Sequence, residues 1–379
     1  MRICVCTVVH HPDDARILHR QIRALLDAGH HVTYLAPFGA HGTSPWPSLT
    51  GVDVPWAHGL RRLGSLWTAR RTLAARLRDS DLLLIHDPEL LLLLPFLRHR
   101  PATVWDVHED TASALVSKAW LPRPLRPVVR PFVRAAERMA ERRLRLLLAE
   151  EGYRGRFRHD HPVVPNTTYV PATAPPPPGT DRVVYLGHLS VARGVGELIE
   201  VARRLRPEGV RVELIGSADD QATRMLDDAR RDDLITWHGY LSNETALARL
   251  EGALAGLSLL HDLPNYRHSL PTKVVEYMGR GIPVVTTPVP PAAEIVARSG
   301  CGLTVPYNDP ATAADVIVRL RDDPSMRAEM GRRGHETASR HFHWPRDGKV
   351  FVAQLEEWAE RRPAPADVPV DGQALRRRT

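Results

Sequence analysis

The sequence predicts an α/β protein made of two doubly wound domains, each a parallel sheet with helices on both faces. Three observations lead to this. The chain has 379 residues, which is long for a single hydrophobic core. Short β-branched runs alternate with segments of helical period from end to end, as in parallel sheets covered by helices. Four consecutive prolines at 175–178 favour a stiff link between the two alternating halves.

The first half opens with the run RICVCTVV, which predicts a strand over 2–9. The apolar positions of 13–29 repeat with the period of one helix face, and Gly29 is suited to end that helix. Further strands are predicted over 31–37, 81–87, 102–110 and 144–150, with an arginine-rich helix over 131–144. We assign these elements to a first domain, 1–170.

The alternation restarts after a proline-rich linker, 171–180. Strands are predicted over 182–187, 210–216, 234–239 and 256–261, and helices are predicted to begin at Arg193, Asp219 and Asn243. These elements form a second domain, 181–340. Helices without intervening strands fill 310–361; the last, in 341–362, is expected to pack back toward the first domain, and 363–379 to be disordered.

Composition and charge exclude several classes of protein. The longest apolar run, 90–97, is broken by Pro95 and is too short to span a membrane. No secretory signal is evident at the N-terminus, so a cytoplasmic protein is expected. The net charge is +7, but basic and acidic residues are mixed without aromatic platforms, so no nucleic-acid partner is expected. Cys4, Cys6 and Cys301 fit neither a disulfide framework nor a zinc site and are expected to be buried thiols.

The stretch HSLPTKVVEYMGRG, from residue 268, predicts a helix that follows a strand of the second sheet. Ser269 is suited to cap it and Pro271 to occupy its first turn, so the helix is expected to begin near 269. Gly279 and Gly281 are suited to end it.

This helix predicts an anion-binding site. In an open α/β sheet, helix N-termini at the carboxyl ends of the strands point free N–H groups at the ligand crevice. Lys273 adds a positive charge in the first turn, and Glu276 can accept from hydroxyl groups of a ribose or sugar. The alternative is an exposed i,i+3 ion pair on a solvated face.

A second element has the same geometry. Gly187 follows a predicted strand, His188 lies in the turn, and Arg193 with Gly194 begins the next helix. Both elements belong to the second domain and are expected to face one crevice.

These segments resemble the retaining nucleotide-sugar glycosyltransferases of family 4, whose GT-B fold is two Rossmann-like domains facing a cleft. The resemblance covers nearly the whole chain in order and spacing. It includes HHPDDARILHRQIRALLDAG from 10, HDPELLLL from 86, WDVHED from 105, VVPNT from 163, VVYLGHLSVARG from 183, LPTKVVEYMGRGIPVV from 270 and EIVARSGCGLTVPYNDP from 294.

The resemblance implies a donor site in the second domain. Glu276 would hold the nucleotide ribose, and the helix N-terminus at Ser269 and Leu270 would hold the diphosphate. Arg193 matches a cation that the family places on the donor phosphates. The remaining donor-binding residues implied are Gly187, His188, Lys273 and His268, the last at a position where the family often has a glutamate.

In the first domain, the resemblance places His108 near the reacting sugar. The alternative is a structural histidine satisfied by Asp106 or Asp110. Acceptor hydroxyls would meet His11, Asp14, Arg16 and His86. For these also a structural alternative stays open: Asp13 or Asp14 caps the first helix, and Asp87 caps the helix after His86.

The resemblance implies transfer of a sugar from a UDP- or GDP-linked donor to a hydroxyl acceptor with retention of configuration. The acceptor left open is a cell-surface glycan precursor or a secondary metabolite, and a lipid-linked acceptor is among the alternatives. Catalytic roles are expected for His108, Arg193 and Lys273. Because Arg193, Lys273 and a helix N-terminus supply positive charge to the leaving group, neither a metal nor a cofactor is expected. A nucleotide-sugar epimerase and a non-catalytic sugar-nucleotide-binding subunit are the alternatives.

The basic segment 126–145 has apolar positions at helical spacing. It favours either a helix that packs its Val, Phe, Ala and Met side chains on the sheet or peripheral contact with an anionic membrane at the inner face.

Overall fold

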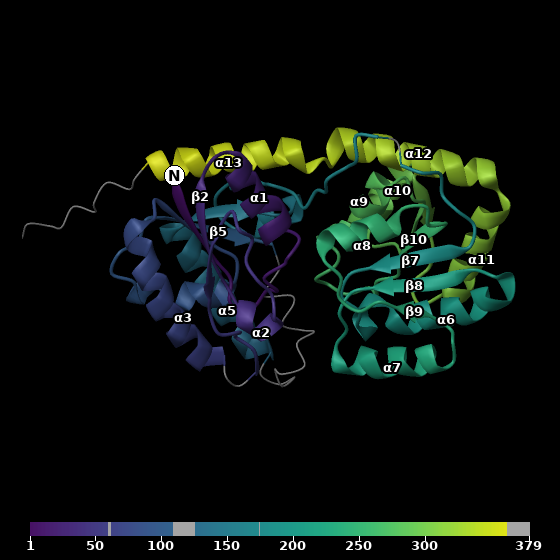
Figure 1. Cartoon of the computed structure of the whole chain (residues 1–379), viewed down its shortest axis with the longest axis horizontal. Helices are drawn as coiled ribbons and strands as arrows, with labels where there is room; N and C mark the ends of the chain where they lie inside the picture. Colours follow the sequence, from purple (N-terminus) through teal and green to yellow (C-terminus); the bar gives the residue numbers. More distant parts are fainter. Residues whose placement is uncertain (60–61, 109–125, 174, 362–379) are drawn as a thin grey trace, which may run out of the picture.

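The computed structural model describes residues 1–59, 62–108, 126–173 and 175–361, and Figure 1 shows them as two α/β domains side by side. Helices α12 (Pro324–His341) and α13 (Trp344–Glu360) run along the same side of the molecule, α12 over the C-terminal domain and α13 over the N-terminal domain (Figure 1). The tail predicted to be disordered lies outside the described residues.

The N-terminal domain is built on a six-stranded parallel sheet of order β3-β2-β1-β4-β5-β6. Its strands are β1 (Arg2–Cys6), β2 (His31–Ala36), β3 (Thr50–Asp53), β4 (Leu82–Ile85), β5 (Ala102–Val107) and β6 (Arg145–Leu148). Its helices and helical turns are η1 (Ile17–Ile22), α1 (Arg23–Asp27), α2 (Phe38–His41), α3 (Arg62–Arg76), η3 (Leu77–Asp79), η4 (Pro88–Leu92), η5 (Leu94–Phe96), α5 (Arg126–Arg143) and η7 (Glu151–Arg156). All strands predicted for this half are confirmed; β3 was not predicted.

The C-terminal domain repeats this topology with the order β12-β11-β10-β7-β8-β9, again all parallel. Its strands are β7 (Arg182–Leu186), β8 (Arg211–Ile215), β9 (Thr236–Trp237), β10 (Ala255–Ser258), β11 (Val284–Thr286) and β12 (Gly302–Thr304). Its helices before α12 are η8 (Val191–Arg193), α6 (Val195–Leu205), η9 (Arg206–Glu208), α7 (Asp220–Arg231), α8 (Asn243–Leu250), α9 (Thr272–Gly279), α10 (Pro290–Ser299) and α11 (Pro310–Asp322). The predicted fold class, two doubly wound parallel sheets, is confirmed.

Each sheet has a hydrophobic core on both faces, as a sheet covered by helices on both sides requires. In the N-terminal domain, Cys4 and Cys6 face the core under α3 and η4, while Ile3 and Val5 face the core under η1 and α13. The three cysteines are buried free thiols, as the sequence predicted.

Helix α13 belongs to the N-terminal domain by its packing. Trp344 and Phe351 are buried in the same core as β1 and β2, and the Trp344 indole N–H donates to the Arg20 carbonyl at 3.1 Å. The chain therefore crosses between the domains twice. The crossings pair through backbone hydrogen bonds, from Thr168 N–H to Phe342 O at 3.0 Å and from Trp344 N–H to Thr168 O at 2.9 Å.

Helix α5 does not pack in the way that its apolar positions predicted. Phe132 is 71% exposed and Met139 is 52% exposed, whereas Glu137 and Glu141 are buried. Glu137 pairs with Arg156, and Glu141 accepts from the backbone N–H groups of residues 158 and 159 at 2.7 and 2.8 Å. These interactions hold the acidic side inward and leave the Phe and Met side chains in solvent.

Among the described residues, no helix is both long and apolar enough to cross a bilayer.

Gly216, directly after β8, has a backbone that only glycine fits. Its φ is +142°, and a Cβ built there would lie 2.0 Å from the carbonyl oxygen of Gly187. We expect Gly216→Ala to destabilise the C-terminal domain by about 3 kcal/mol through strain and overlap. Gly209, with φ +70° and nothing within 4 Å of its Cβ, is the control. Gly209→Ala is expected to destabilise by about 1 kcal/mol. Equal calorimetric melting shifts for the two variants would contradict this.

Candidate functional site

A cleft of about 480 Å³ lies between the two domains. It is formed by loops at the carboxyl ends of β1 and β5 on one side and of β7 and β8, with the start of α9, on the other. Both sheets reverse their strand order at the pairs β1/β4 and β7/β10, and ligands of open α/β sheets bind outside such switch points. The cleft brings together most of the predicted residues, which are His11, Asp14, Arg16, His108, Gly187, His188, Arg193, Ser269, Leu270, Lys273 and Glu276.

Lys273 is the most unusual group in the cleft. Its side chain is buried, with 6% exposed, and its ammonium has no hydrogen-bond partner among the described residues. The ammonium lies 3.6 Å from the centroid of the Tyr185 ring, a cation–π contact. Burial, and then the charge of Arg193, lower the pKa of Lys273 well below its usual 10.5. The predicted alternative of an exposed ion pair is therefore wrong.

Two glycines shape the turn that follows β7. A Cβ at Gly187 would lie 3.5 Å from Lys273 Cε and 3.6 Å from Nζ, and its φ is +121°. At Gly194, where φ is +84°, a Cβ would lie 2.1 Å from the carbonyl oxygen of Leu259. Gly187 is therefore required by its positive φ, since a Cβ there would make ordinary contact with Lys273, and Gly194 is required both by its φ and by its close approach to Leu259.

His188 lines the same wall but does not act as a second fixed cation. Its Nδ1 lies 3.0 Å from the hydroxyl of Ser217. Burial lowers the pKa of His188, and the charges of Arg193 and Lys273 lower it further. The imidazole is therefore neutral near pH 7, and Arg193 is the charged member of the pair.

Glu276 is held from the opposite domain. Its Oε1 accepts from the Arg20 guanidinium at 2.9 Å, and both side chains are buried. A buried charge pair of this kind needs further hydrogen bonds to be favourable, and Arg20 also donates to Asn166 at 3.4 Å. Since a carboxylate accepts at both oxygens, Oε2 is the oxygen that can meet a hydroxyl from the cleft.

The helix of Lys273 and Glu276 begins later than predicted. Helix α9 starts at Thr272 with Pro271 at the N-cap and without a side-chain cap. The prediction that Ser269 caps it is wrong, because Ser269 lies three residues before the first helical residue and the N-cap position is taken by Pro271. The predicted end of the helix at Gly279 is confirmed.

His268, predicted to bind the donor, does not line the cleft. It is exposed and its backbone lies against Gly152, where a Cβ would come 2.7 Å from the His268 carbonyl oxygen. His268 therefore takes part in a contact between the domains, and the prediction that it lies in the donor site is corrected.

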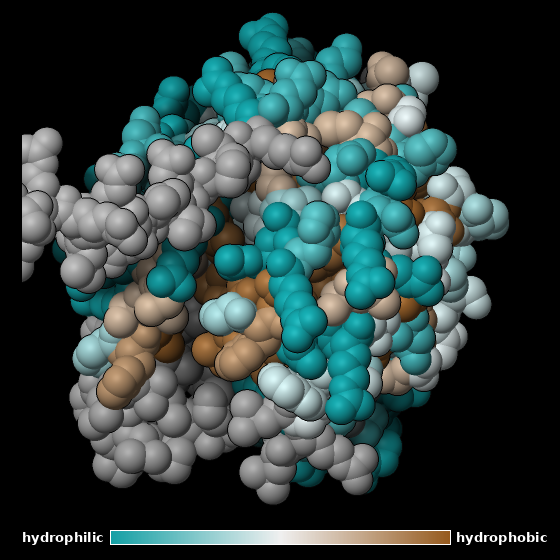
Figure 2. All heavy atoms as spheres, turned by 90° about the vertical axis from the view of Figure 1, so that its left-hand side faces the viewer, coloured by the Kyte–Doolittle hydropathy of each residue, from teal (hydrophilic) through white to brown (hydrophobic). Residues whose placement is uncertain are grey.

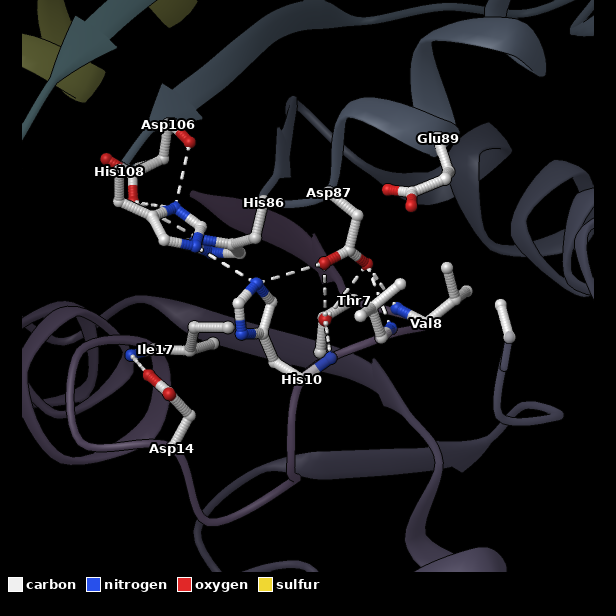
Figure 3. A network of polar contacts seen from close by, with 12 residues as sticks. Thr7, Val8, His10, Asp14, Ile17, His86, Asp87, Glu89, Asp106 and His108 are labelled. Carbon is white, nitrogen blue, oxygen red and sulfur yellow. Dashed lines mark hydrogen bonds and ion pairs between the residues drawn. The ribbon is translucent and has the colours of Figure 1, made fainter. Parts of the chain in front are cut away.

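The N-terminal wall is a network of carboxylates and histidines, which Figure 3 shows between β1, β4 and β5. His108 Nδ1 lies 3.1 Å from the Asp106 carbonyl oxygen and 3.5 Å from its carboxylate. Because both are acceptors, Nδ1 carries the proton of a neutral His108. Its Nε2 then meets His10 Nε2 at 3.0 Å, and His10 in turn lies 3.3 Å from Asp87.

Asp87 does not cap the helix that follows it. Its carboxylate accepts from the Thr7 hydroxyl at 3.0 Å and from the Val9 N–H at 3.2 Å, and it also bonds the Val8 N–H. Asp87 therefore ties β4 to the end of β1 and positions His10, and the alternative of a cap is wrong.

Arg16 is a structural residue of this wall. Its guanidinium donates to both oxygens of Asp106 at 2.7 and 2.6 Å, and to Asn166 at 3.0 Å. Burial opposes ionisation of Asp106, but Arg16 outweighs it and holds the pKa of Asp106 well below 3.8. The predicted contact of Arg16 with an acceptor is corrected: its donors face Asp106 and Asn166.

His86 is buried behind the cleft, with 1% exposed. Its Nδ1 lies 3.2 Å from Asp106, without the geometry of a hydrogen bond. Burial lowers the pKa of His86, so it is neutral, and the prediction that it faces the acceptor is wrong. Asp110, the second partner considered for His108, lies outside the described residues.

The sequence left open whether Asp13 or Asp14 caps the first helix, and the structure shows that Asp14 does so. Its Oδ1 accepts from the N–H groups of Arg16 at 2.8 Å and Ile17 at 3.0 Å, so the expected contact of Asp14 with an acceptor is replaced by a capping role. Asp13 instead pairs with His19 at 2.6 Å and accepts from the Tyr240 hydroxyl at 2.8 Å. Tyr240 comes from the C-terminal domain and also stacks on His11, with ring centroids 4.3 Å apart.

His86, Asp106 and His108 can each offer one ligand atom within 4.8 Å of the others, as a metal site would require. Arg16 already occupies both oxygens of Asp106. A divalent cation would have to displace that guanidinium, so these residues do not fit a resident metal.

Sequence reasoning missed His10, Arg20 and Tyr240, which also line the cleft. The first two lie in the segment 10–29 that carried the resemblance, but nothing local distinguishes His10 from His11. Arg20 and Glu276 are 256 positions apart, and such a pairing leaves no periodic signal.

A two-domain α/β protein of this topology, with a cationic wall facing a cleft, has the architecture of GT-B glycosyltransferases. Residues 180–323 match the family of glycosyl transferases group 1. Residues 180–323 are thus similar to a group 1 glycosyl transferase domain, and the chain as a whole has a GT-B fold.

Known proteins agree with this assignment. The chain is 26% identical over 206 residues to D-inositol 3-phosphate glycosyltransferase of Arthrobacter sp. (strain FB24), covering 50% of this chain and 48% of that protein. It is 25% identical over 209 residues to glycogen synthase of Mycobacterium tuberculosis, covering 53% and 48%. The matches thus span about half the length of these curated relatives.

Solved structures share the fold over almost the whole chain. Sucrose-phosphate synthase from Thermosynechococcus elongatus superposes with a TM-score of 0.71 at 18% identity, covering 94% of this chain and 98% of that one. Anabaena HepE in complex with UDP-glucose gives a TM-score of 0.68 at 14% identity, covering 94% and 100%.

The Arg16–Asp106 pair gives a testable prediction. Asp106→Asn leaves the buried guanidinium without its counterion, and we expect a loss of about 3–5 kcal/mol at pH 7. Because the pKa of Asp106 is depressed, the pair stabilises the fold above pH 3.8, and this contribution is lost as pH falls through the folded pKa. Melting temperatures at pH 7 and at lower pH measure both effects.

The control is Asp81→Asn, which breaks a pair with Arg2 whose side chains are 45% and 58% exposed. A change of about 1 kcal/mol or less is expected there. If Asp106→Asn were no more destabilising than Asp81→Asn, Asp106 would not anchor the wall.

Proposed function

We propose that this protein is a retaining glycosyltransferase that moves a sugar from a nucleoside-diphosphate sugar to a hydroxyl acceptor. The observation that carries the proposal is the ammonium of Lys273, buried without a hydrogen-bond partner among the described residues. A buried ammonium is strongly unfavourable unless an anion meets it, and the diphosphate of a sugar nucleotide would supply that anion.

The surrounding groups define where the donor would lie. The diphosphate would meet Lys273, Arg193 and the N-terminus of α9 at Leu270, where free N–H groups and the helix dipole favour an anion. The nucleotide ribose would bond Glu276 through Oε2. Anabaena HepE, of the same fold, is described with UDP-glucose, which supports a UDP-linked donor; a GDP-linked one fits the same contacts.

The cleft suits transfer with retention. The bond from the anomeric carbon to the diphosphate breaks, and the acceptor oxygen forms a bond to the same face of that carbon. The acceptor proton passes to the departing phosphate. Arg193 and Lys273 stabilise the charge that develops on the leaving group, without a metal. His108 projects from the opposite wall, where it can hold the donor sugar or the acceptor, beside His11.

Lys273→Met gives the sharpest test, because function and stability should change in opposite directions. Removing a buried unpaired charge should raise the melting temperature of the empty protein. The same change should weaken binding of UDP and GDP by about tenfold or more, the effect of one charged hydrogen bond. Calorimetric titration and thermal shift measure both, and EDTA should not alter wild-type binding.

Lys349→Met is the matched control, since Lys349 is exposed on α13. It should leave both quantities unchanged. If neither nucleotide bound the wild type, or if Lys273→Met bound them equally well, the donor site would be wrong. With donor and acceptor supplied, release of the nucleoside diphosphate separates transfer from epimerisation and from a purely binding role.

We further propose that the acceptor is lipid-linked and that the protein docks at the inner face of a membrane through one side of its N-terminal domain. Five of the large hydrophobic side chains found exposed lie in the layer of α3, η4, η5 and α5, namely Trp67, Leu92, Phe96, Phe132 and Met139. Figure 2 shows hydrophobic groups open to solvent among hydrophilic ones at this end. Arg134, Arg138 and Arg142 are exposed beside them on α5, which suits anionic lipid.

Co-sedimentation with vesicles tests this docking. The wild type should bind vesicles rich in phosphatidylglycerol and not pure phosphatidylcholine. The double variant Phe132→Ser, Met139→Ser should bind about tenfold more weakly, since it loses most of the inserted apolar area of α5. Val350→Ser, at a site 55% exposed on α13, should not change binding. Absence of wild-type binding to the anionic vesicles would remove the membrane from the proposal.

A further inference from the structure

Arg20 joins the two walls of the cleft, from η1 of the N-terminal domain to α9 of the C-terminal domain. Its guanidinium donates to Glu276 Oε1 at 2.9 Å, and both side chains are buried. Glu276 follows Lys273 by three residues on α9, the spacing at which a lysine and a glutamate of one helix ordinarily pair. The Glu276 carboxylate nevertheless pairs with Arg20, and the Lys273 ammonium has no hydrogen-bond partner among the described residues. Pairing across the cleft thus replaces pairing along the helix.

The N-terminal side of the molecule holds Arg20 in place independently of Glu276. The Arg20 carbonyl accepts from the Trp344 indole N–H at 3.1 Å, which fixes its backbone against α13. Its guanidinium also donates at 3.4 Å to Asn166 Oδ1, an oxygen that accepts from Arg16 at 3.0 Å as well. Because Arg20 is anchored in this way, it determines where the Glu276 carboxylate lies.

The partner of Glu276 decides whether the Lys273 ammonium is available to a ligand. Opposite charges attract more strongly inside a protein than in water, so a Glu276 released from Arg20 would be drawn to Lys273. An ammonium paired in this way offers less positive charge to a diphosphate, and the carboxylate beside it repels one. With Glu276 neutralised by Arg20, Lys273 keeps its charge for an incoming anion.

We propose that Arg20 is a positioning residue of the donor site: by pairing with Glu276 across the cleft, it keeps this carboxylate from neutralising Lys273 and so leaves the ammonium for the donor diphosphate. This inference rests on the proposed function. Arg20 and Lys273 belong to different domains, so the arrangement exists only while the domains meet at this point. Donor binding and the contact between the domains therefore stabilise each other.

Melting temperatures without nucleotide test the change of partner, through the effect of Lys273→Met in two backgrounds. In the wild type this change should raise the melting temperature, because it removes a buried ammonium that has no hydrogen-bond partner among the described residues. In Arg20→Met, Glu276 turns to Lys273, so the same change should lower the melting temperature by leaving a buried carboxylate without its partner. If Arg20→Met does not fold, Arg20→Gln takes its place, since its neutral amide can still donate to Asn166.

Arg23→Met is the matched control. Arg23 also joins the two domains, through a pair with Glu244 at 3.8 Å whose side chains are 47% and 79% exposed. Lys273→Met should raise the melting temperature in this background as it does in the wild type.

Calorimetric titration with inorganic pyrophosphate in EDTA tests the consequence for the anion, since pyrophosphate carries no ribose and does not need Glu276. Arg20→Met should bind it about tenfold more weakly than the wild type, the effect of one charged hydrogen bond, and Arg20→Lys should regain part of this affinity. The double variant Arg20→Met, Glu276→Met should regain it fully, because apolar side chains can replace a buried ion pair. The double variant should still bind UDP weakly, because it has lost the ribose acceptor.

The same sign of the Lys273→Met shift in the wild type and in Arg20→Met, or equal pyrophosphate affinity of these two proteins, would overturn the inference, while UDP binding by the wild type would leave the donor site intact. A reversed sign with neither pyrophosphate nor UDP bound by the wild type would instead count against the proposed function, and would overturn the role of Arg20 in donor binding with it.

Discussion

A buried lysine whose ammonium has no hydrogen-bond partner in the part of the chain that the structure describes organises the cleft. Lys273 is enclosed by Tyr185, the backbone of Gly187 and the first turn of α9, and its nearest charged neighbour of the same sign is Arg193. Burying an ammonium in this way is unfavourable by several kcal/mol unless an anion or good acceptors meet it. A fold that keeps such a group gives up stability at this place, which is common where binding or catalysis is the selected property.

On the N-terminal wall of the cleft, the buried carboxylates are neutralised by other groups of the protein. Asp106 is neutralised by Arg16, and Asp87 is surrounded by donors from the end of β1. His10 and His108 lie between these two carboxylates. This wall is therefore preorganised without a ligand, whereas the C-terminal wall is electrostatically incomplete without one. An anion binding in the cleft will be drawn to the C-terminal side, and a neutral hydroxyl compound can occupy the N-terminal side.

Much of the fold followed from local pattern, because long strands of parallel sheets are continuous apolar runs and their helices repeat with a clear period. The edge strands β3 (TGVD) and β12 (GLT) each contain a glycine and only one large apolar residue, so they show no continuous apolar run. The start of α9 was misjudged for another reason. Ser269 has the right chemistry for a cap, but the helix begins only at Thr272, with Pro271 at the N-cap position.

Some residues of the candidate site could be predicted from the sequence, and others could be found only in the structure. Lys273, Arg193 and Gly187 lie within 187–276, inside the segment 180–323 that matches the family, so a resemblance in sequence could locate them. Arg20 with Glu276 and Asp13 with Tyr240 join residues 256 and 227 positions apart, and only the assembled cleft shows these pairs. The N-terminal wall, with His10, His11 and His108, lies outside the matched segment. On the proposed function, the segment that this chain shares with its relatives carries the donor side, and the histidine-rich wall across the cleft would select the acceptor.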